Sequence, residues 1–366
     1  MMHIAFFIPD YRGGGAQNMV INLANHIAAN GYKVDLLIAS AAGELKHKIN
    51  GHVNVVCFNK SKTSKSIPAL IKYTKESQPD VMISALYHAN IAALLAKIFC
   101  KTTKTKFIIS ERNHISTSFA HSQRFADKIM LFLMKRLYKT ADKVIAISDG
   151  VLRDVQKVCN IADDKIIRIY NPVVTPDFER AIAAEIPEFG YEVDVAKLIA
   201  SGRLVAQKDY PTLLKALSIA VKTHPCCLVI LGQGSLEHDL KALAVTLGVD
   251  NYIYWAGFVD NPLSYMAKAD VFVLSSAWEG FGNVVVEGLY CGLSVVSTDC
   301  PSGPAEILEK GRYGYLSAVG DADALARNII EAIDKPFAAE SQRSRAAAFH
   351  VRNIAENYID AAKGVL

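Results

Sequence analysis

The sequence has 366 residues, of which 51% are hydrophobic and 21% are charged, and its formal net charge is +4. This composition excludes disordered, collagen-like and disulfide-stapled chains, and the length predicts about two domains. No run of about 18 apolar residues occurs and the first residues lack the pattern of a signal peptide, so we expect a cytoplasmic protein that does not span a membrane.

The charge is unevenly distributed between the two halves of the sequence. Residues 1–175 carry 24 Lys and Arg against 12 Asp and Glu, whereas residues 176–366 carry 16 against 24. The basic residues at 60–75, at 97–106 and around the apolar run 129–134 suit an anionic membrane surface or an anionic lipid-linked substrate, with solvated helix faces as the alternative. They are not interleaved with aromatic residues in a nucleic-acid-binding motif, so we expect no nucleic acid partner.

Short β-branched runs alternate with amphipathic stretches through the first half. This alternation predicts a parallel sheet with helices on both faces. We expect strands at 4–8, 34–39, 53–58, 81–85, 106–110, 143–147 and 165–170. We expect helices at 16–30, 66–77, 89–99, 122–139 and 150–159.

The same alternation restarts at residue 197, after a linker at about 175–195 that contains Pro176 and Pro187. We expect strands at 197–201, 227–231, 252–255, 271–274 and 294–297, and helices at 210–222, 236–247 and 284–291. The predicted fold class is α/β, with doubly wound Rossmann-like domains at 1–175 and 176–345 and a helix at 346–366 that packs back toward the first domain. The carboxyl ends of both sheets would face a shared crevice.

Two loops are predicted to bind phosphate. Gly13, Gly14 and Gly15 lie between the first strand and the first helix, where the backbone can approach a ligand closely and the helix N-terminus attracts an anion, although a tight turn explains the triplet equally well. Arg203 and Lys208 directly follow the first strand of the second domain, and two such cations can neutralise a diphosphate without a metal.

Glu279 and Glu287 lie eight residues apart in a segment that joins a strand to a helix. Carboxylates placed there can bind sugar or ribose hydroxyls, while the helix N-terminus at 283–285 remains open to a phosphate. A glycosidase pair is the alternative, but a glycosidase does not need a diphosphate site.

No metal site is expected. The seven cysteines are scattered without C-x-x-C spacing, which indicates reduced thiols. Asp321 and Asp323 form a D-x-D string, but they precede an apolar helical stretch, so we expect a helix cap.

These motifs together resemble glycosyltransferase family 4. The resemblance rests on Gly14-Gly15-Ala16-Gln17, Gly202-Arg203 with Lys208, Gly232-Gln233-Gly234, Gly257-Phe258, and Glu279 with Glu287, in the family's order over nearly the whole chain. It extends to bacterial members that use UDP-sugars, including N-acetylgalactosaminyltransferases that build lipid-linked oligosaccharides or surface polysaccharides.

The resemblance implies a GT-B fold and a retaining, metal-independent transfer of a hexose or N-acetylhexosamine from a UDP-sugar, with no cofactor. Arg203 and Lys208 would hold the diphosphate, Glu287 the ribose and Glu279 the donor sugar. The acceptor would be a prenyl-diphosphate oligosaccharide or a lipopolysaccharide or capsule precursor, bound at the cytoplasmic face of the membrane. The implied donor contacts are Gly14, Gly15, Gly202, Gly234, Phe258, Gly280, Phe281, Gly282, Asn283, Val284 and Glu287.

The first domain departs from the family pattern. Many relatives place a histidine near the sugar after a strand in the middle of this domain, where this sequence has Glu111-Arg112-Asn113-His114. Glu111, Arg112 and His114 all remain candidates, and His114 is included among the catalytic residues. A UDP-sugar epimerase and a noncatalytic nucleotide-sugar-binding subunit are the alternative functions.

Overall fold

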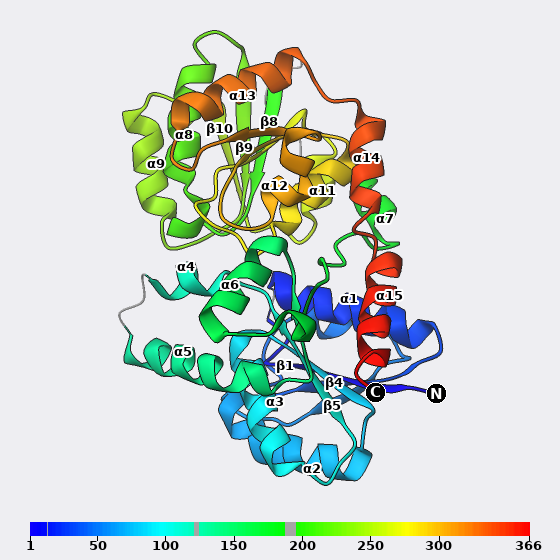
Figure 1. The fold of residues 1–366 in the computed structure, drawn as a ribbon. Coiled ribbons are helices and arrows are strands. Elements are labelled where there is room, and N and C mark those ends of the chain that lie inside the picture. The colour runs from blue at the N-terminus through cyan, green and yellow to red at the C-terminus, as the bar shows by residue number, and fades with distance from the viewer. Residues whose placement is uncertain (13, 121–123, 187–194) are drawn as a thin grey trace. The chain divides into compact units, whose positions relative to one another are not determined.

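The computed structural model describes residues 1–12, 14–120, 124–186 and 195–366. Gly13, residues 122–123 of one expected helix and residues 187–194 of the expected linker, including Pro187, lie outside the described residues. The chain forms two compact units: Met1–Pro172 with Val351–Leu366 make unit 1, and Val173–His350 make unit 2 (Figure 1).

Unit 1 is built on a sheet of seven parallel strands. Their spatial order is β3-β2-β1-β4-β5-β6-β7, so the chain winds outward in both directions from β1 and β4. The strands are β1 (His3–Ile8), β2 (Lys33–Ile38), β3 (Asn54–Cys57), β4 (Val81–Ala85), β5 (Lys106–Glu111), β6 (Lys143–Ala146) and β7 (Ile166–Arg168). The helices are α1 (Gly15–Ala29), α2 (Ile67–Ser77), α3 (Tyr87–Phe99), α4 (Ile115–Ala120), α5 (Phe125–Leu137), α6 (Asp149–Cys159) and α15 (Val351–Lys363).

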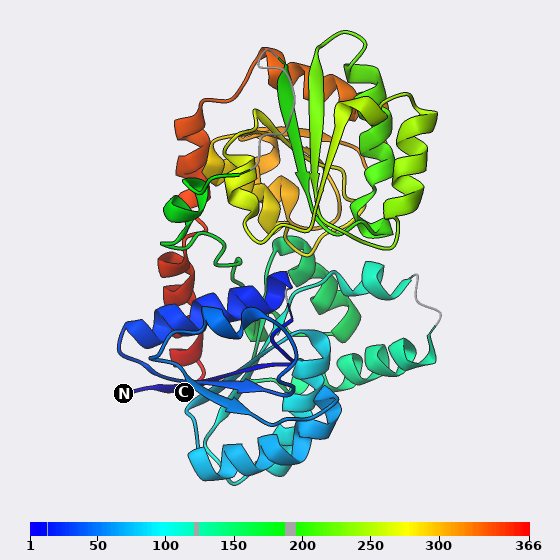
Figure 2. The ribbon, with the colours of Figure 1, turned by 180° about the vertical axis from the view of Figure 1, so that it is seen from behind.

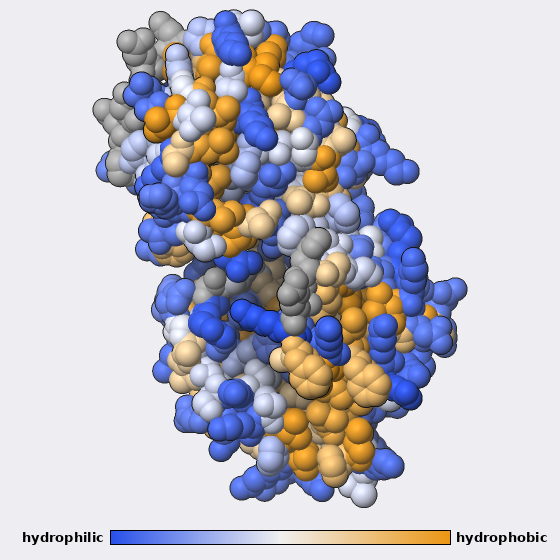
Figure 3. All heavy atoms as spheres, turned by 90° about the vertical axis from the view of Figure 1, so that its left-hand side faces the viewer, coloured by the Kyte–Doolittle hydropathy of each residue, from blue (hydrophilic) through white to orange (hydrophobic). Residues whose placement is uncertain are grey.

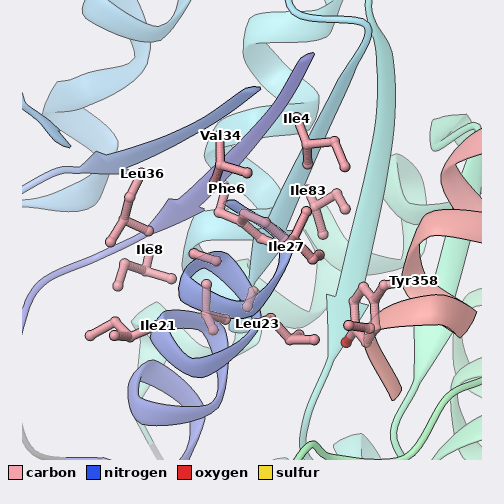
Figure 4. Packing of buried hydrophobic residues seen from close by; sticks show 14 of the residues in the cluster. Ile4, Phe6, Ile8, Ile21, Leu23, Ile27, Val34, Leu36, Ile83 and Tyr358 are labelled. Carbon is pink, nitrogen blue, oxygen red and sulfur yellow. The ribbon is translucent and has the colours of Figure 1, made fainter. Parts of the chain in front are cut away.

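The alternation of side chains along β1 produces the two layers of helices in unit 1. Because successive side chains of a strand point to opposite faces, Ile4, Phe6 and Ile8 enter one core while Ala5 and Phe7 enter the other. The first core contains α1 and α15, which contributes Tyr358 (Figure 4), and the second contains α2 and α3. In Figure 2, α15, drawn in red, lies beside α1, drawn in blue.

Unit 2 is built on six parallel strands in the order β10-β9-β8-β11-β12-β13. The strands are β8 (Ala196–Ser201), β9 (Cys226–Leu231), β10 (Ile253–Gly257), β11 (Val271–Leu274), β12 (Ser294–Thr298) and β13 (Tyr315–Ser317). The helices are α7 (Phe178–Ile182), α8 (Tyr210–Ala220), α9 (Glu237–Thr246), α10 (Pro262–Met266), α11 (Asn283–Cys291), α12 (Pro304–Ile307), α13 (Ala322–Asp334) and α14 (Ala339–Ala347). The core around β8 and β9 is closed by α8, α9 and α13.

The predicted fold class is confirmed, because both sheets are parallel and carry helices on their faces. The sequence analysis did not predict β13, and the expected linker contains α7. The tail forms two helices, α14 and α15, instead of one at 346–366. Asp321 caps α13, its carboxylate accepting a hydrogen bond of 2.8 Å from the amide of Ala324, as expected of the D-x-D string. Among the described residues, no helix is both long enough and apolar enough to cross a membrane.

Candidate active site

The carboxyl ends of β8 and β11 lie side by side at the centre of the unit 2 sheet. β8 is followed by β9 on one side, and β11 is followed by β12 on the other, so the direction of winding changes between them. Open α/β sheets bind ligands outside the strand ends at such a switch point. The loop at 202–209 and the loop at 275–282 both begin there, and they carry three of the four residues that the sequence predicted as catalytic: Arg203, Lys208 and Glu279.

Lys208 and Glu279 form an ion pair across these two loops. The distance from Lys208 Nζ to Glu279 Oε1 is 2.6 Å, and the hydroxyl of Ser276 donates a 2.8 Å hydrogen bond to the same oxygen. The two side chains are only 15% and 9% exposed. Because an ammonium group has three donors, Lys208 keeps N–H groups for an anion while Glu279 fixes its position.

Hydrogen bonds to the backbone also tie the two loops together. The hydroxyl of Ser275 donates to the carbonyl of Lys208 at 2.8 Å, and the amide of Ala277 donates to the carbonyl of Gln207 at 2.8 Å. The side chain of Gln207 in turn donates to the carbonyl of Trp278 at 2.9 Å. The position of Lys208 is therefore set by the loop at 275–282 as well as by its own strand.

Glycines allow a third strand end to approach the loop at 202–209. Gly232 follows β9 with a φ of +137°, and a Cβ there would lie 2.1 Å from the carbonyl oxygen of Gly202. A Cβ on Gly234 would lie 2.3 Å from the carbonyl oxygen of Leu204. Gly202 itself leaves space for the stem of Lys208, whose Cε would be 3.0 Å from a Cβ. Close packing therefore favours glycine at all three positions, and at Gly202 and Gly232 a positive φ also favours it.

Arg203 is exposed at the start of the same loop. Within the described parts of the chain its guanidinium makes no hydrogen bond or ion pair, whereas the neighbouring carbonyl of Gly202 accepts a 3.1 Å bond from Tyr210. The backbone next to Arg203 is thus held by a hydrogen bond, while the side chain of Arg203 is exposed to solvent. A fork-shaped cation in this position is suited to a phosphate.

The glycine-rich turn at 280–282 leads into α11. Gly282 precedes the helix with a φ of +93°, and no acidic side chain occupies the first turn. The N-terminus of α11 therefore offers N–H groups and a partial positive charge beside the Lys208 pair. Glu287 lies in the second turn of α11 and is half-buried, as are Asn283 and Val284.

Phe281 is buried and stacks edge-on against Phe349, with ring centroids 5.5 Å apart. It holds the turn before α11 in place and presents no surface to a ligand. Phe258 follows β10 and is 66% exposed, so it is the accessible aromatic side chain of the two.

In unit 1, the predicted glycines lie at the start of α1. Gly14 precedes the helix in an extended conformation and Gly15 is its first residue. Asp10, at the end of β1, accepts hydrogen bonds from Arg12 at 2.8 and 2.5 Å and from Gln17 at 3.1 Å. Burial alone would raise the pKa of Asp10, but these hydrogen bonds outweigh it and hold the pKa of that carboxyl below its usual value.

Glu111 and Arg112 are both buried in the core of unit 1. Glu111 accepts hydrogen bonds from Tyr138 at 2.6 Å and from the amide of Arg112 at 2.9 Å, and burial raises the pKa of its carboxyl in spite of them. The guanidinium of Arg112 donates to Asn171 at 2.9 Å and to Tyr358 of α15 at 3.3 Å. Both side chains are therefore committed to internal contacts.

His114 is the partly exposed member of the three candidates. Its Nδ1 lies 3.0 Å from the hydroxyl of Thr117 and 3.5 Å from a carboxylate oxygen of Asp154. Asp154 also accepts hydrogen bonds from the amide and hydroxyl of Ser116. Thr117 and Asp154 thus contact Nδ1 of the imidazole. The other ring nitrogen, Nε2, is the one that could contact a substrate.

His88 was missed by the sequence analysis. It follows β4, next to β1 at the switch point of the unit 1 sheet, and burial lowers the pKa of its imidazole. His88 and Asp10 line a cavity of about 550 Å³. Lys208 was predicted because it is a polar residue that follows a strand. The same criterion would have selected His88 if the strand order had been known.

Comparison with known proteins agrees with this architecture. A family model described as "Glycosyltransferase Family 4" matches residues 13–176, and one described as "Glycosyl transferases group 1" matches residues 183–349. The chain is 28% identical over 340 residues to an N-acetylgalactosamine-N,N'-diacetylbacillosaminyl-diphospho-undecaprenol 4-alpha-N-acetylgalactosaminyltransferase of Campylobacter jejuni, covering 90% of this chain and 89% of the relative. It is 31% identical over 266 residues to a lipopolysaccharide 1,6-galactosyltransferase of Escherichia coli, covering 70% and 67%.

Among solved structures, the HepE protein of Anabaena in complex with UDP and glucose superposes with a TM-score of 0.78 at 19% identity, covering 100% of both chains. This likeness shows the fold, and the sequence matches identify the family. The chain is a glycosyltransferase of the GT-B fold, and it belongs to glycosyltransferase family 4.

Proposed function

We propose that the protein transfers a hexose or an N-acetylhexosamine from a UDP-sugar to a lipid-linked glycan, with retention of the anomeric configuration and without a metal ion. The observation that carries this proposal is the meeting of three positive groups at the switch point of the unit 2 sheet. They are the Lys208 ammonium fixed by Glu279, the exposed guanidinium of Arg203 and the N-terminus of α11.

In the proposed reaction the bond between the anomeric carbon and the diphosphate oxygen breaks, and a bond to the acceptor hydroxyl forms on the same face. The proton of that hydroxyl moves to the departing diphosphate oxygen. Negative charge develops on the diphosphate, where Arg203, Lys208 and the helix N-terminus stabilise it in place of a metal. Glu279 would contact the donor sugar, and Glu287 would bind the ribose hydroxyls.

The named relatives support the substrate classes. The Campylobacter jejuni relative is named for an acceptor with an undecaprenyl diphosphate, and the Escherichia coli relative for lipopolysaccharide. The HepE structure contains UDP and glucose. The HepE complex thus supports a UDP-sugar as the donor, and the names of the other two relatives support a lipid-linked glycan as the acceptor.

A transfer assay tests this proposal. The purified protein is incubated with UDP-GalNAc, UDP-GlcNAc, UDP-galactose or UDP-glucose and a prenyl-diphosphate-linked glycan, with and without EDTA, and the product anomer is determined by NMR. We expect an α-linked product from one of the four donors, equally fast with EDTA, and thermal stabilisation by UDP but not by GDP or ADP.

Each part of the proposal can fail separately in this assay. A β-linked product would overturn retention, and loss of turnover in EDTA would overturn metal independence. Stabilisation by GDP or ADP alone would change the donor class. Interconversion of UDP-sugars without an acceptor would identify an epimerase, and UDP binding without any turnover would identify a noncatalytic subunit.

The location on an anionic membrane surface is part of the same proposal. The side chains of Phe125, Ile129 and Phe132 are 77%, 41% and 57% exposed and recur along one side of α5 at helical spacing. Exposed basic residues flank them at Lys128 and Lys135, and Figure 3 shows hydrophobic side chains gathered on the face of unit 1 that carries α5. An apolar stripe bordered by cations is suited to the interface of an anionic bilayer.

Vesicle flotation measures this binding. We expect the protein to bind vesicles that contain anionic lipid at about 50 mM salt and to be released at about 500 mM, because the electrostatic part of the attraction is screened. The double variant Ile129→Ser and Phe132→Ser should lose most of the binding, whereas Val245→Ser, which alters a 64% exposed side chain of α9, should not. Binding that is independent of salt, or equal in the two variants, would contradict the membrane location.

A further inference from the structure

The cavity of about 550 Å³ in unit 1 is lined by none of the residues that the sequence predicted for the site. It lies outside the carboxyl ends of β1 and β2, where Asp10 and Ser40 belong to its wall. Both strands lie at or next to the switch point of the unit 1 sheet, so the cavity occupies the place where this kind of sheet binds ligands. Its volume suits an organic ligand and not a single ion.

One side of the cavity is apolar and is formed by three helices. Its apolar members are contributed by α2, α3 and α5, and α3 also contributes the imidazole of His88, whose pKa is lowered by burial, to the cavity lining. The apolar members are Ile67, Ile91, Ala92, Leu95, Met130 and Leu133. Burial of hydrocarbon against such a wall provides about 25 cal/mol per Å² of area removed from water.

The other side of the cavity is polar and more exposed. Lys62 and Ser64 are exposed there, and Arg12 is 73% exposed and paired with Asp10. Within the described residues Lys62 makes no ion pair. With the charge of Arg12 balanced by Asp10, Lys62 is an excess positive charge at the opening.

We propose that this cavity binds the start of the isoprenoid chain of a prenyl-diphosphate-linked acceptor, with the hydrocarbon against α3 and α5 and the diphosphate beside Lys62. This inference rests on the proposed function, since it specifies how the lipid-linked acceptor is recognised. The apolar wall excludes a free sugar phosphate as the preferred ligand. The excess positive charge of Lys62 at the opening favours an anionic lipid over an uncharged one.

The arrangement of α5 provides an exit for the rest of the chain. Met130 and Leu133 line the cavity, and their sequence neighbours Ile129 and Phe132 belong to the exposed stripe. One helix therefore forms both the wall of the cavity and the surface that we assign to the membrane. A prenyl chain longer than the cavity could pass from one to the other without crossing water.

Calorimetric binding of prenyl diphosphates tests this inference without turnover. Inorganic, dimethylallyl and geranyl diphosphate are titrated into the full-length protein in the presence of saturating UDP, which occupies the donor site. We expect geranyl diphosphate to bind at least tenfold more tightly than inorganic diphosphate. Leu95→Trp fills the cavity, and Leu133→Gln makes its wall polar. Both variants should abolish the difference in affinity between geranyl and inorganic diphosphate. Ile98→Gln, which alters a 45% exposed side chain of α3 that does not line the cavity, is the matched control and should retain it.

Thermal stabilisation by UDP shows whether each variant remains folded. The inference would be overturned if affinity did not rise with the length of the prenyl chain. It would also be overturned if affinity rose equally in Leu95→Trp, Leu133→Gln and the native protein. If sugar transfer from a UDP-sugar persists in that case, the proposed function stands without it. If affinity rises with prenyl chain length and the cavity variants abolish that rise, but the protein neither binds UDP nor transfers sugar, the inference is supported and the proposed function is overturned.

Discussion

Replacing Lys208 with methionine is expected to reduce sugar transfer by about a thousandfold and to destabilise unit 2 by about 3 kcal/mol. The loss of activity follows because the departing diphosphate loses a fixed cation in a site that we propose to work without metal. The loss of stability follows because Glu279, which is 9% exposed, keeps its charge while losing the ammonium group 2.6 Å away. Steady-state kinetics and thermal unfolding measure the two effects.

A double variant separates the two effects. Glu279→Gln removes the uncompensated charge, and the amide oxygen can still accept a hydrogen bond from Ser276, so Lys208→Met with Glu279→Gln should recover most of the lost stability. Transfer should remain as slow as in Lys208→Met. Recovery of activity in the double variant would show that Lys208 acts only as a structural partner of Glu279.

The matched control is Lys215→Met in the same unit. Lys215 is exposed on α8, so its charge is solvated and its loss should change stability by less than about 0.5 kcal/mol and leave transfer unaffected. If Lys215→Met slows transfer as strongly as Lys208→Met, the effect is one of net charge and the assignment of Lys208 is wrong.

The strands were predictable because their side chains obey simple burial rules. β1, β4 and β11 are buried at every position and are apolar except at His3 and Ser84, as central parallel strands are, and their limits were predicted within a residue. β13 was missed although β7, which also has three residues, was predicted, because β7 lies within the longer run 165–170 and β13 has no such flanking pattern. The split of the tail into α14 and α15 follows a short break at 348–350, which no Pro or Gly marks.

The candidate site residues were predicted from their positions after strands, whereas the contacts between them were not predictable. Lys208 and Glu279 each follow a strand, but their pairing depends on β8 lying next to β11, and strand order is not visible in a single sequence. The cavity in unit 1 has walls from α2, α3 and α5, which are separate segments of the sequence, so no local motif carries it. Burial of Glu111 and Arg112 was hidden for the same reason, because their partners Tyr138 and Tyr358 are distant in sequence.

Gly303→Ala is the second substitution for which we expect a large effect. Gly303 has a φ of +99°, and a Cβ there would lie 1.9 Å from the carbonyl oxygen of Phe281. The turn at 280–282 would have to move, and with it the N-terminus of α11, which begins at Asn283. We expect a loss of stability of about 3 kcal/mol and at least a tenfold weaker binding of UDP, measured by thermal unfolding and calorimetry.

Gly320→Ala separates steric overlap from backbone strain. Gly320 also has a positive φ, of +77°, but a Cβ there would meet nothing within 4 Å. The alanine therefore suffers only the conformational penalty, about 1 kcal/mol, and UDP binding should be unchanged. If the two variants lose equal stability and bind UDP equally well, the approach of Gly303 to Phe281 does not hold the start of α11. If Gly303→Ala alone loses UDP, the close packing behind α11 is what keeps its N-terminus at the diphosphate.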